Sequence, residues 1–406
     1  MPDIGHRLEE LRESGLYRRL RIVESPQGPQ VLLDGRAVML LCSNDYLGLA
    51  DDAQVRCASS DAAMKWGTGA GASRLVSGTM TVHGELERRL AEFKGKPAAL
   101  LFGSGYLANA GVVSALAGRG EVVFSDELNH ASIIDGCRLS RAETFVYRHA
   151  DTEHLEWGLR KAGERASLIV SDGIFSMDGD VAPLPELAEL AGRHGSRLMV
   201  DEAHATGCIG PGGRGSVAEA GLEDQVDVVM GTLGKALGNY GAYVCTDEQL
   251  AEYLVNVCRP FIFSTALPPA VVAGAQRALE LIGQRPSMGE RLAANAEALR
   301  EGLREQGLEP GPSRTQIVPL VVGDAADAVA LCEGALERGV FAQAIRPPTV
   351  PEGTSRLRMT AMATHRIKDL RRAARELGAA ARELGIGAAP VERIDSAEPR
   401  QLDRAA

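Results

Sequence analysis

Two stretches decide the fold: Met199-Val200-Asp201-Glu202-Ala203-His204, and further along Gly231-Thr232-Leu233-Gly234-Lys235-Ala236. In the first, an apolar run ends in the carboxylate of Asp201, and His204 follows three positions later. In the second, another apolar run ends in a threonine, and Lys235 stands between small residues. Short apolar runs of this kind are typical of buried strands. We therefore expect a carboxylate, a histidine and an amine just beyond the ends of two strands.

Similar runs recur along the chain at a spacing that predicts an α/β fold. They lie near 98–102, 121–125, 144–148, 167–171, 197–201, 227–231 and 241–246. The segments 107–118, 151–163 and 183–194 are long enough to be crossover helices. This alternation predicts a mainly parallel, seven-stranded sheet with helices on both faces. The short gap between the last two runs favours an antiparallel pair there.

The pattern then changes, and it indicates a second domain. A helical stretch over 268–307 leads to strand-like runs at 316–322, 339–344 and 356–360, which alternate with helices at 325–337 and 367–384. We expect four parts: an N-terminal arm (1–50), a large domain (51–285), a smaller C-terminal α+β domain (286–386) and a flexible tail (387–406).

Composition excludes several classes of function. The net charge of -10 argues against a nucleic-acid partner. The seven cysteines form no C-x-x-C pair, which fits reduced thiols in the cytoplasm better than disulfides or a zinc site. No run of apolar residues is long enough to cross a membrane, and the charged N-terminus does not look like a signal peptide.

Four groups indicate a site for pyridoxal 5'-phosphate (PLP). Asp201, at the end of a buried strand, needs a partner such as a protonated ring nitrogen, and His204 lies within reach of the same ring. Lys235 is placed to form a Schiff base, and Thr232 offers a hydroxyl to a phosphate. A nucleotide-hydrolase loop is excluded, because Val229 replaces its first glycine and Ala236 its hydroxyl residue.

Other candidate groups follow the remaining strands. Gly103-Ser104-Gly105-Tyr106 opens a helix, so it is either a phosphate cradle or a plain turn. His130 either stacks on a flat ring or, with Asn129 and Ser132, caps a helix. Ser176 could bond a ring hydroxyl, and Asp178 and Asp180 are read as a turn rather than a metal site.

These motifs together resemble the α-oxoamine synthases, which are fold type I PLP enzymes. The resemblance covers about 1–385 and rests on Ser43–Leu49, Gly69–Gly78, Phe175–Asp180, Val200–Gly207 and Gly231–Lys235. At Ala344–Pro351 the chain is most similar to the family members of biotin synthesis. Those members condense L-alanine with a pimeloyl thioester, carried by coenzyme A or by acyl carrier protein, and release carbon dioxide.

The resemblance implies a role for each candidate residue. Lys235 would bind PLP and move protons, Asp201 would pair with the ring nitrogen, and His130 would stack on the ring. The resemblance further implies that the ring hydroxyl is contacted by His204 and Ser176, and that the phosphate is held by Gly105, Tyr106 and Thr232. In a homodimer, Ser264 and Thr265 would reach the partner subunit's phosphate. On the substrate side, the resemblance implies that Arg358 binds the amino-acid carboxylate and that the acyl side is lined by Arg18, Asn44 and Thr349.

Two alternatives remain open. One is a sister synthase that uses glycine or serine with another acyl thioester. The other is a protein with the PLP fold that binds partners without catalysis. The basic cluster from Arg18 to Arg21 is either a solvated face or an arm that binds an anionic partner such as acyl carrier protein.

Overall fold

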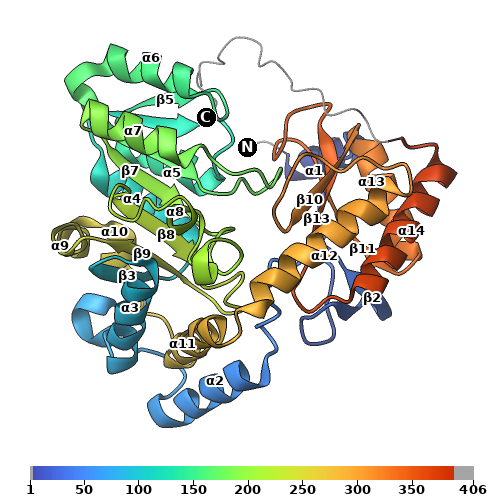
Figure 1. The fold of residues 1–406 in the computed structure, drawn as a ribbon, viewed down its shortest axis with the longest axis horizontal. Coiled ribbons are helices and arrows are strands. Elements are labelled where there is room, and N and C mark those ends of the chain that lie inside the picture. Colours follow the sequence, from blue (N-terminus) through green and yellow to red (C-terminus); the bar gives the residue numbers. More distant parts are fainter. Residues whose placement is uncertain (1–2, 388–406) are drawn as a thin grey trace. The chain divides into compact units, whose positions relative to one another are not determined.

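The computed structural model describes residues 3–387, which fall into two compact units (Figure 1). The first unit comprises the described residues up to Asp51, the segment Met177–Asp180 and the described residues from Glu290 onward. The second comprises Asp52–Ser176 and Val181–Gly289. The N-terminal arm thus belongs to the same unit as the residues expected to form the C-terminal domain. The expected tail from residue 388 onward lies outside the described residues.

The second unit is built on a seven-stranded sheet in the order β3-β9-β8-β7-β6-β4-β5. Its strands are β3 (Ala98–Phe102), β4 (Val122–Asp126), β5 (Glu143–Tyr147), β6 (Ala166–Asp172), β7 (Arg197–Asp201), β8 (Val228–Thr232) and β9 (Ala242–Thr246). Only β9 runs against the others, pairing antiparallel with both β3 and β8. The predicted mainly parallel sheet and the expected antiparallel pairing of its last two strands, β8 and β9, are confirmed, while the antiparallel pairing of β9 with β3 was not predicted.

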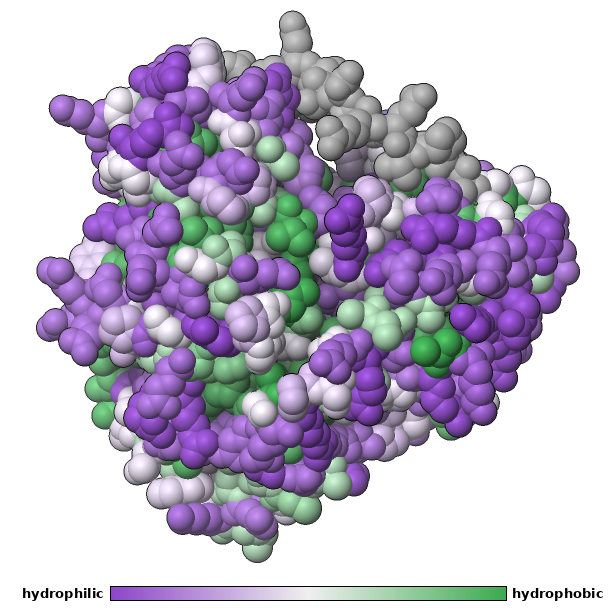
Figure 2. Space-filling view, viewed as in Figure 1, coloured by the Kyte–Doolittle hydropathy of each residue, from purple (hydrophilic) through white to green (hydrophobic). Residues whose placement is uncertain are grey.

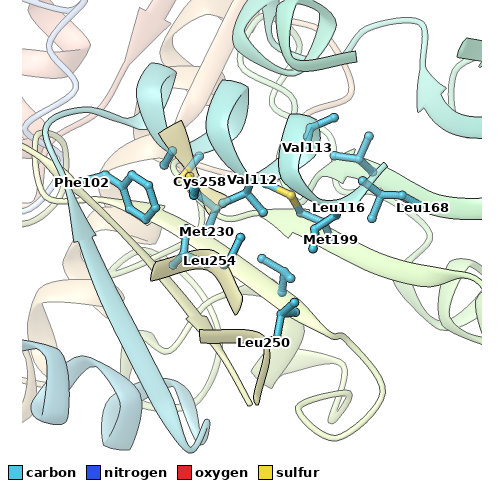
Figure 3. Packing of buried hydrophobic residues seen from close by; sticks show 14 of the residues in the cluster. Phe102, Val112, Val113, Leu116, Leu168, Met199, Met230, Leu250, Leu254 and Cys258 are labelled. Atoms are coloured by element: carbon cyan, nitrogen blue, oxygen red, sulfur yellow. The ribbon is translucent and has the colours of Figure 1, made fainter. Parts of the chain in front are cut away.

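Helices cover both faces of this sheet. They are α2 (Ala53–Trp66), α3 (Thr81–Lys94), α4 (Gly105–Leu116), α5 (Ala131–Ser140), α6 (Thr152–Ala162), α7 (Leu184–His194), α8 (Ser216–Glu219), α9 (Glu248–Val257), α10 (Arg259–Phe263) and α11 (Pro269–Gln284), with a π turn at Arg74–Gly78 and 3-10 turns at Gly163–Arg165 and Pro211–Gly213. Helices α4, α5, α9 and α10 pack on one face, where Val112, Met230 and Leu254 belong to a common apolar cluster (Figure 3). Helices α3, α6 and α7 contact the sheet from the other face.

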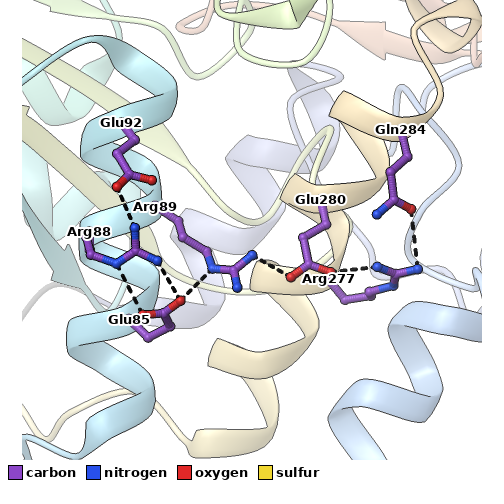
Figure 4. Close-up of polar contacts among 7 residues, drawn as sticks. All are labelled: Glu85, Arg88, Arg89, Glu92, Arg277, Glu280 and Gln284. Carbon is purple, nitrogen blue, oxygen red and sulfur yellow. Dashed lines mark hydrogen bonds and ion pairs between the residues drawn. The ribbon is translucent and has the colours of Figure 1, made fainter.

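Charged side chains join α3 to α11 at the surface of this unit (Figure 4). Arg89 donates to Glu85 within α3, and its other end bonds Glu280 of α11. Glu280 also accepts from Arg277 of its own helix. These side chains are partly exposed, so each pair contributes no more than about 1 kcal/mol to stability.

The first unit contains two small sheets of three strands each. In one, β1 (Gln30–Leu33) and β2 (Arg36–Leu40) form a hairpin, and β11 (Val340–Phe341) joins parallel to β2. In the other, β13 (Ser355–Thr360) lies between β10 (Ile317–Gly323) and β12 (Gln343–Ile345). The helices are α1 (Ile4–Glu13), α12 (Ser287–Arg304), α13 (Ala325–Glu337) and α14 (Ile367–Leu384). Helix α14 buries Leu370 and Leu377 and presents mostly hydrophilic residues outward (Figure 2).

Two expectations about the elements were wrong. The helical stretch over 268–307 is two helices, because Pro286 lacks the N–H that a continuous helix needs. The strand expected at 339–344 is two short strands, since β11 pairs with β2 whereas β12 pairs with β13. Within residues 3–387, no helix is both long and apolar enough to cross a membrane.

A buried ion pair holds the segment after β7 in place. Lys94, the last residue of α3, donates to the carboxylate of Glu202 and to Thr206 Oγ1 at 2.8 Å. The other oxygen of Glu202 accepts from Ser216 Oγ at 2.9 Å and from the N–H of residue 217 at 2.7 Å. Gly215 is required beside it, because its φ is +102° and a Cβ there would collide with the Glu202 carboxylate. Glu202 lies between Asp201 and His204 in the sequence, so the pair fixes the backbone that carries them.

We expect Glu202→Gln to destabilise the fold by about 3–5 kcal/mol, because it leaves the Lys94 ammonium buried without its counter-charge. Thermal melting monitored by circular dichroism measures the loss. The matched control is Glu143→Gln, which breaks the exposed Arg165 pair and should cost no more than about 1 kcal/mol. Equal melting temperatures for the two variants would contradict this role for the buried pair. The double variant Lys94→Met/Glu202→Gln should recover part of the stability.

Candidate active site

The candidate residues of the sheet unit lie past the carboxyl ends of parallel strands. Gly105 follows β3, His130 follows β4, Ser176 follows β6, and Lys235 follows β8, while Asp201 is the last residue of β7. The carboxyl ends of parallel strands share one edge of a sheet, and ligands bind along that edge in open α/β folds. The topology therefore brings these residues to the same edge, although they are far apart in sequence.

Asp201 is buried and bonded to neutral donors. Its Oδ1 accepts the N–H of Ala203 at 2.8 Å, and its Oδ2 accepts Nδ2 of Asn109 at 2.7 Å. A buried carboxylate with neutral partners keeps its negative charge available for a cation. A protonated aromatic nitrogen is the kind of cation that such a carboxylate stabilises.

Lys235 and His204 meet at this edge. Nζ of Lys235 lies 2.8 Å from Nε2 of His204, which is buried, while the lysine is half-buried. The lysine sits in a tight turn closed by a bond from the N–H of Gly238 to its carbonyl. Thr232, at the end of β8, donates its hydroxyl to the carbonyl of Gly241 at 3.0 Å and accepts the N–H of Gly234 at 3.1 Å. The turn thus presents one amine beside one imidazole.

His130 caps helix α5 with its side chain, because Nδ1 accepts the N–H of Ser132. Its own N–H donates to the carboxylate of Asp172 at 3.0 Å. Asn129 does not cap the helix. Its Nδ2 donates to Ser125 Oγ and its Oδ1 accepts the N–H of Asp172, which ties the ends of β4 and β6 together. His130 as a whole is exposed, but its ring nitrogen Nδ1 lies against Ser132. Partial burial of the ring lowers the pKa of His130.

The start of α4 provides backbone N–H groups. Ser104 caps the helix by accepting from Leu107, and the helix begins at Gly105. Tyr106 is exposed, and its hydroxyl bonds Asp135 of α5. Ser264 and Thr265, expected at the partner subunit's phosphate, line a small recess with Gly103 in this chain, and their expected role stays a prediction.

The first unit holds the expected substrate residues in two groups. Arg358, on β13, is buried and donates from Nη1 to Asn44 Oδ1 and from Nη2 to the Tyr46 hydroxyl, both at 3.3 Å. The hydroxyl of Tyr46 also donates to Asn44 at 3.0 Å. Tyr46 was not among the expected residues. A guanidinium held by neutral oxygens can bind an incoming carboxylate as a fork.

Thr349 and Arg18 belong to segments that are joined to each other. Arg346 donates to the carbonyl of Gly15 and to that of Tyr17 at 3.4 Å, so the loop carrying Thr349 is tied to the arm carrying Arg18. Both residues are exposed.

The basic cluster from Arg18 to Arg21 is partly committed within the unit. Arg21 pairs with Glu333 and lies 3.6 Å from Asp34, and Arg19 lies 3.7 Å from Glu333. Arg21 therefore serves as an internal contact rather than as an open anion-binding group.

The residues of the sheet unit fit PLP. An amine is available for a covalent bond, a buried carboxylate for the ring nitrogen, and a helix N-terminus for the phosphate. His130 supplies a ring whose surface is accessible. The individual roles given to these residues stay predictions.

Sequence reasoning missed Asn109 and the Lys94–Glu202 pair, and it considered Ser132 only as part of a helix cap. Asn109 lies four residues after Gly105 on α4, so it is one helical turn from the expected phosphate cradle. A polar residue inside a helix of otherwise small and apolar residues was the available signal. The pairing of Lys94 with Glu202 spans 108 positions, and no local pattern indicates it.

Comparisons with known proteins agree with the fold and the family resemblance. The model of the family "aminotransferase class I and II" matches residues 36–377. An 8-amino-7-oxononanoate synthase from Geobacter sulfurreducens is 54% identical over 91% of this chain and 95% of its own length. A solved serine palmitoyltransferase from S. paucimobilis, with bound PLP and myriocin, superposes with a TM-score of 0.89 at 35% identity, covering 94% of this chain and 97% of that one.

A solved 8-amino-7-oxononanoate synthase from Francisella tularensis gives a TM-score of 0.74 at 28% identity, covering 86% of this chain and 99% of that one. The family model covers most of the chain, and the similarity in sequence and in fold extends along nearly its whole length. This chain therefore belongs to the aminotransferase class I and II family and, within it, to the α-oxoamine synthases of fold type I, alongside the 8-amino-7-oxononanoate synthases.

Proposed function

We propose that this protein condenses L-alanine with a pimeloyl thioester, releasing carbon dioxide and forming 8-amino-7-oxononanoate for biotin synthesis, with PLP as its cofactor. The observation that carries the proposal is the contact of Lys235 with His204 at the sheet edge where Asp201 ends β7. The choice of alanine and a pimeloyl group is supported by the relatives named 8-amino-7-oxononanoate synthase.

Each residue of the sheet edge has a defined task in this reaction. When bound, PLP supplies an electron sink for the amino-acid α-carbon. Asp201 keeps the ring nitrogen protonated, and Lys235 holds the cofactor covalently and moves the proton at the α-carbon. His204 and Ser176 address the ring hydroxyl, and His130 stacks on the ring. The phosphate is held by a set of three residues, Gly105, Tyr106 and Thr232.

The first unit supplies the groups for the substrates. Arg358 binds the carboxylate of alanine through its guanidinium fork. Arg18, Asn44 and Thr349 line the acyl side. Support for Arg358 comes from its burial on β13 beside the oxygens of Asn44 and Tyr46, where a carboxylate would find an oriented cation.

The active form that we propose is a homodimer in the cytoplasm. Leu75 and Val76, next to the bridge between Ser73 and Thr265, are 54% and 79% exposed, and Phe263 is 69% exposed. Apolar side chains gathered in this way are typical of a surface covered by another chain. The unpaired cysteines fit a reducing compartment.

Lys235→Ala should abolish turnover and covalent attachment of the cofactor, because no other group replaces the amine. Borohydride reduction followed by mass spectrometry measures the attachment: the wild-type chain gains the mass of the cofactor, and the variant does not. The control is Lys65→Ala, which removes an exposed lysine of α2 and should leave attachment unchanged. A variant that still acquires the cofactor at another lysine would contradict the assignment.

The product of the purified enzyme tests the substrates. With L-alanine and either pimeloyl-coenzyme A or pimeloyl-acyl carrier protein, mass spectrometry should detect 8-amino-7-oxononanoate. Glycine or serine with acetyl-coenzyme A should give at most about a hundredth of that rate, a difference of about 2.7 kcal/mol in transition-state binding. Faster turnover with those pairs would favour a sister synthase. A colourless protein without turnover would favour partner binding without catalysis.

A further inference from the structure

The amide of Asn109 joins two groups of the site. Asn109 lies inside α4 and is 1% exposed. One N–H of its Nδ2 donates to Asp201 Oδ2 at 2.7 Å, and the other donates to Ser132 Oγ at 2.9 Å. Both amide hydrogens of Asn109 are therefore donated to these two residues.

The orientation of this amide is forced by its neighbours. An ionised carboxylate only accepts hydrogen bonds, so the nitrogen of Asn109 must face Asp201. The amide oxygen is then buried, and no group within residues 3–387 donates to it. A buried oxygen without a hydrogen-bond donor destabilises a fold, and buried polar atoms that lack partners are found most often at functional sites. The two donated bonds, rather than the stability of the core, therefore set the position of Asn109.

The same amide determines the direction of the next hydrogen bond. Ser132 Oγ accepts from Asn109, which leaves the hydroxyl hydrogen free to donate to Nδ1 of His130 at 2.7 Å. The backbone N–H of Ser132 points to the same Nδ1 at 3.3 Å. A ring nitrogen that faces two donors must act as an acceptor. The proton of the neutral His130 ring then resides on Nε2.

The titratable groups around His130 fit this arrangement. Asp172 accepts the backbone N–H of His130, and the charges of Asp201 and Lys235 act on the ring from β7 and from the turn after β8. Burial has the largest effect and, together with the positive charge of Lys235, lowers the pKa of His130, while Asp201 opposes the change. The ring is therefore neutral at neutral pH.

We propose that Asn109 and Ser132 are positioning residues that link the Asp201 carboxylate to the His130 ring in one chain of hydrogen bonds and place the His130 proton on Nε2. The chain orients the carboxylate for the ring nitrogen and fixes the imidazole that lies against the cofactor. The consequence for turnover rests on the proposed function, whereas the position of the proton does not depend on any substrate.

Nitrogen NMR of isotope-labelled histidine in the holoenzyme measures the tautomer directly, and His130→Asn identifies the signals of His130. The wild type should show a proton on Nε2 and an unprotonated Nδ1 across neutral pH. Ser132→Ala removes the hydroxyl donor and should give a mixture of the two tautomers. Ser114→Ala, a matched change on α4 where the hydroxyl bonds only the carbonyl of Gly111 at 3.1 Å, should leave the tautomer unchanged.

Kinetics and cofactor binding give the second readout. Because one hydrogen bond is lost, Ser132→Ala should lower kcat about tenfold with little change in KM, and Asn109→Ala should also weaken PLP binding about tenfold. A wild-type His130 protonated on Nδ1 would overturn the proposal. So would a Ser132→Ala enzyme with the tautomer and kcat of Ser114→Ala. If the protein made no oxononanoate at all, the proposed function would fail while the tautomers of the wild type and of Ser132→Ala still decided this inference.

Discussion

The buried carboxylate of Asp201 is the constraint on which the site depends. It ends a central strand and is bonded to neutral donors, so its charge is available to a cation that enters the site. A protonated aromatic nitrogen meets that requirement, and it turns the cofactor into an electron acceptor. Lys235 and His204 at the same edge supply the amine and the imidazole that such chemistry uses.

The fold keeps this carboxylate in place from several directions. Parallel strands bring the ends of β4, β6, β7 and β8 to one edge, and helices on both faces keep those strands dry. Behind the edge, Lys94 and Glu202 lock the segment that follows Asp201. Asn109 reaches the carboxylate from α4. A strand, two helices and a buried ion pair thus act together to fix the orientation of the Asp201 side chain.

The periodicity of the sequence was sufficient to predict the seven-stranded sheet, because each strand of the second unit is a short apolar run and each crossover is a helix of ordinary length. Periodicity failed where the pairing of strands distant in sequence decides the extent of a strand. The run at 339–344 divides because its two halves bond strands of different sheets, β2 and β13. In the site, Asp201 and Lys235 could be predicted because each follows a strand. Asn109 stands out as a polar residue within its helix, but its role could not be predicted, since that role comes from contact with a residue 92 positions away.

The protonation state of the ring nitrogen tests the central claim most directly. Nitrogen NMR of the holoenzyme, prepared with PLP labelled at the ring nitrogen, reports whether that atom carries a proton. The wild-type enzyme should show a protonated nitrogen at neutral and mildly alkaline pH, and Asp201→Asn should show an unprotonated one. An unprotonated nitrogen in the wild type, or a protonated one in Asp201→Asn, would contradict the role of the buried carboxylate.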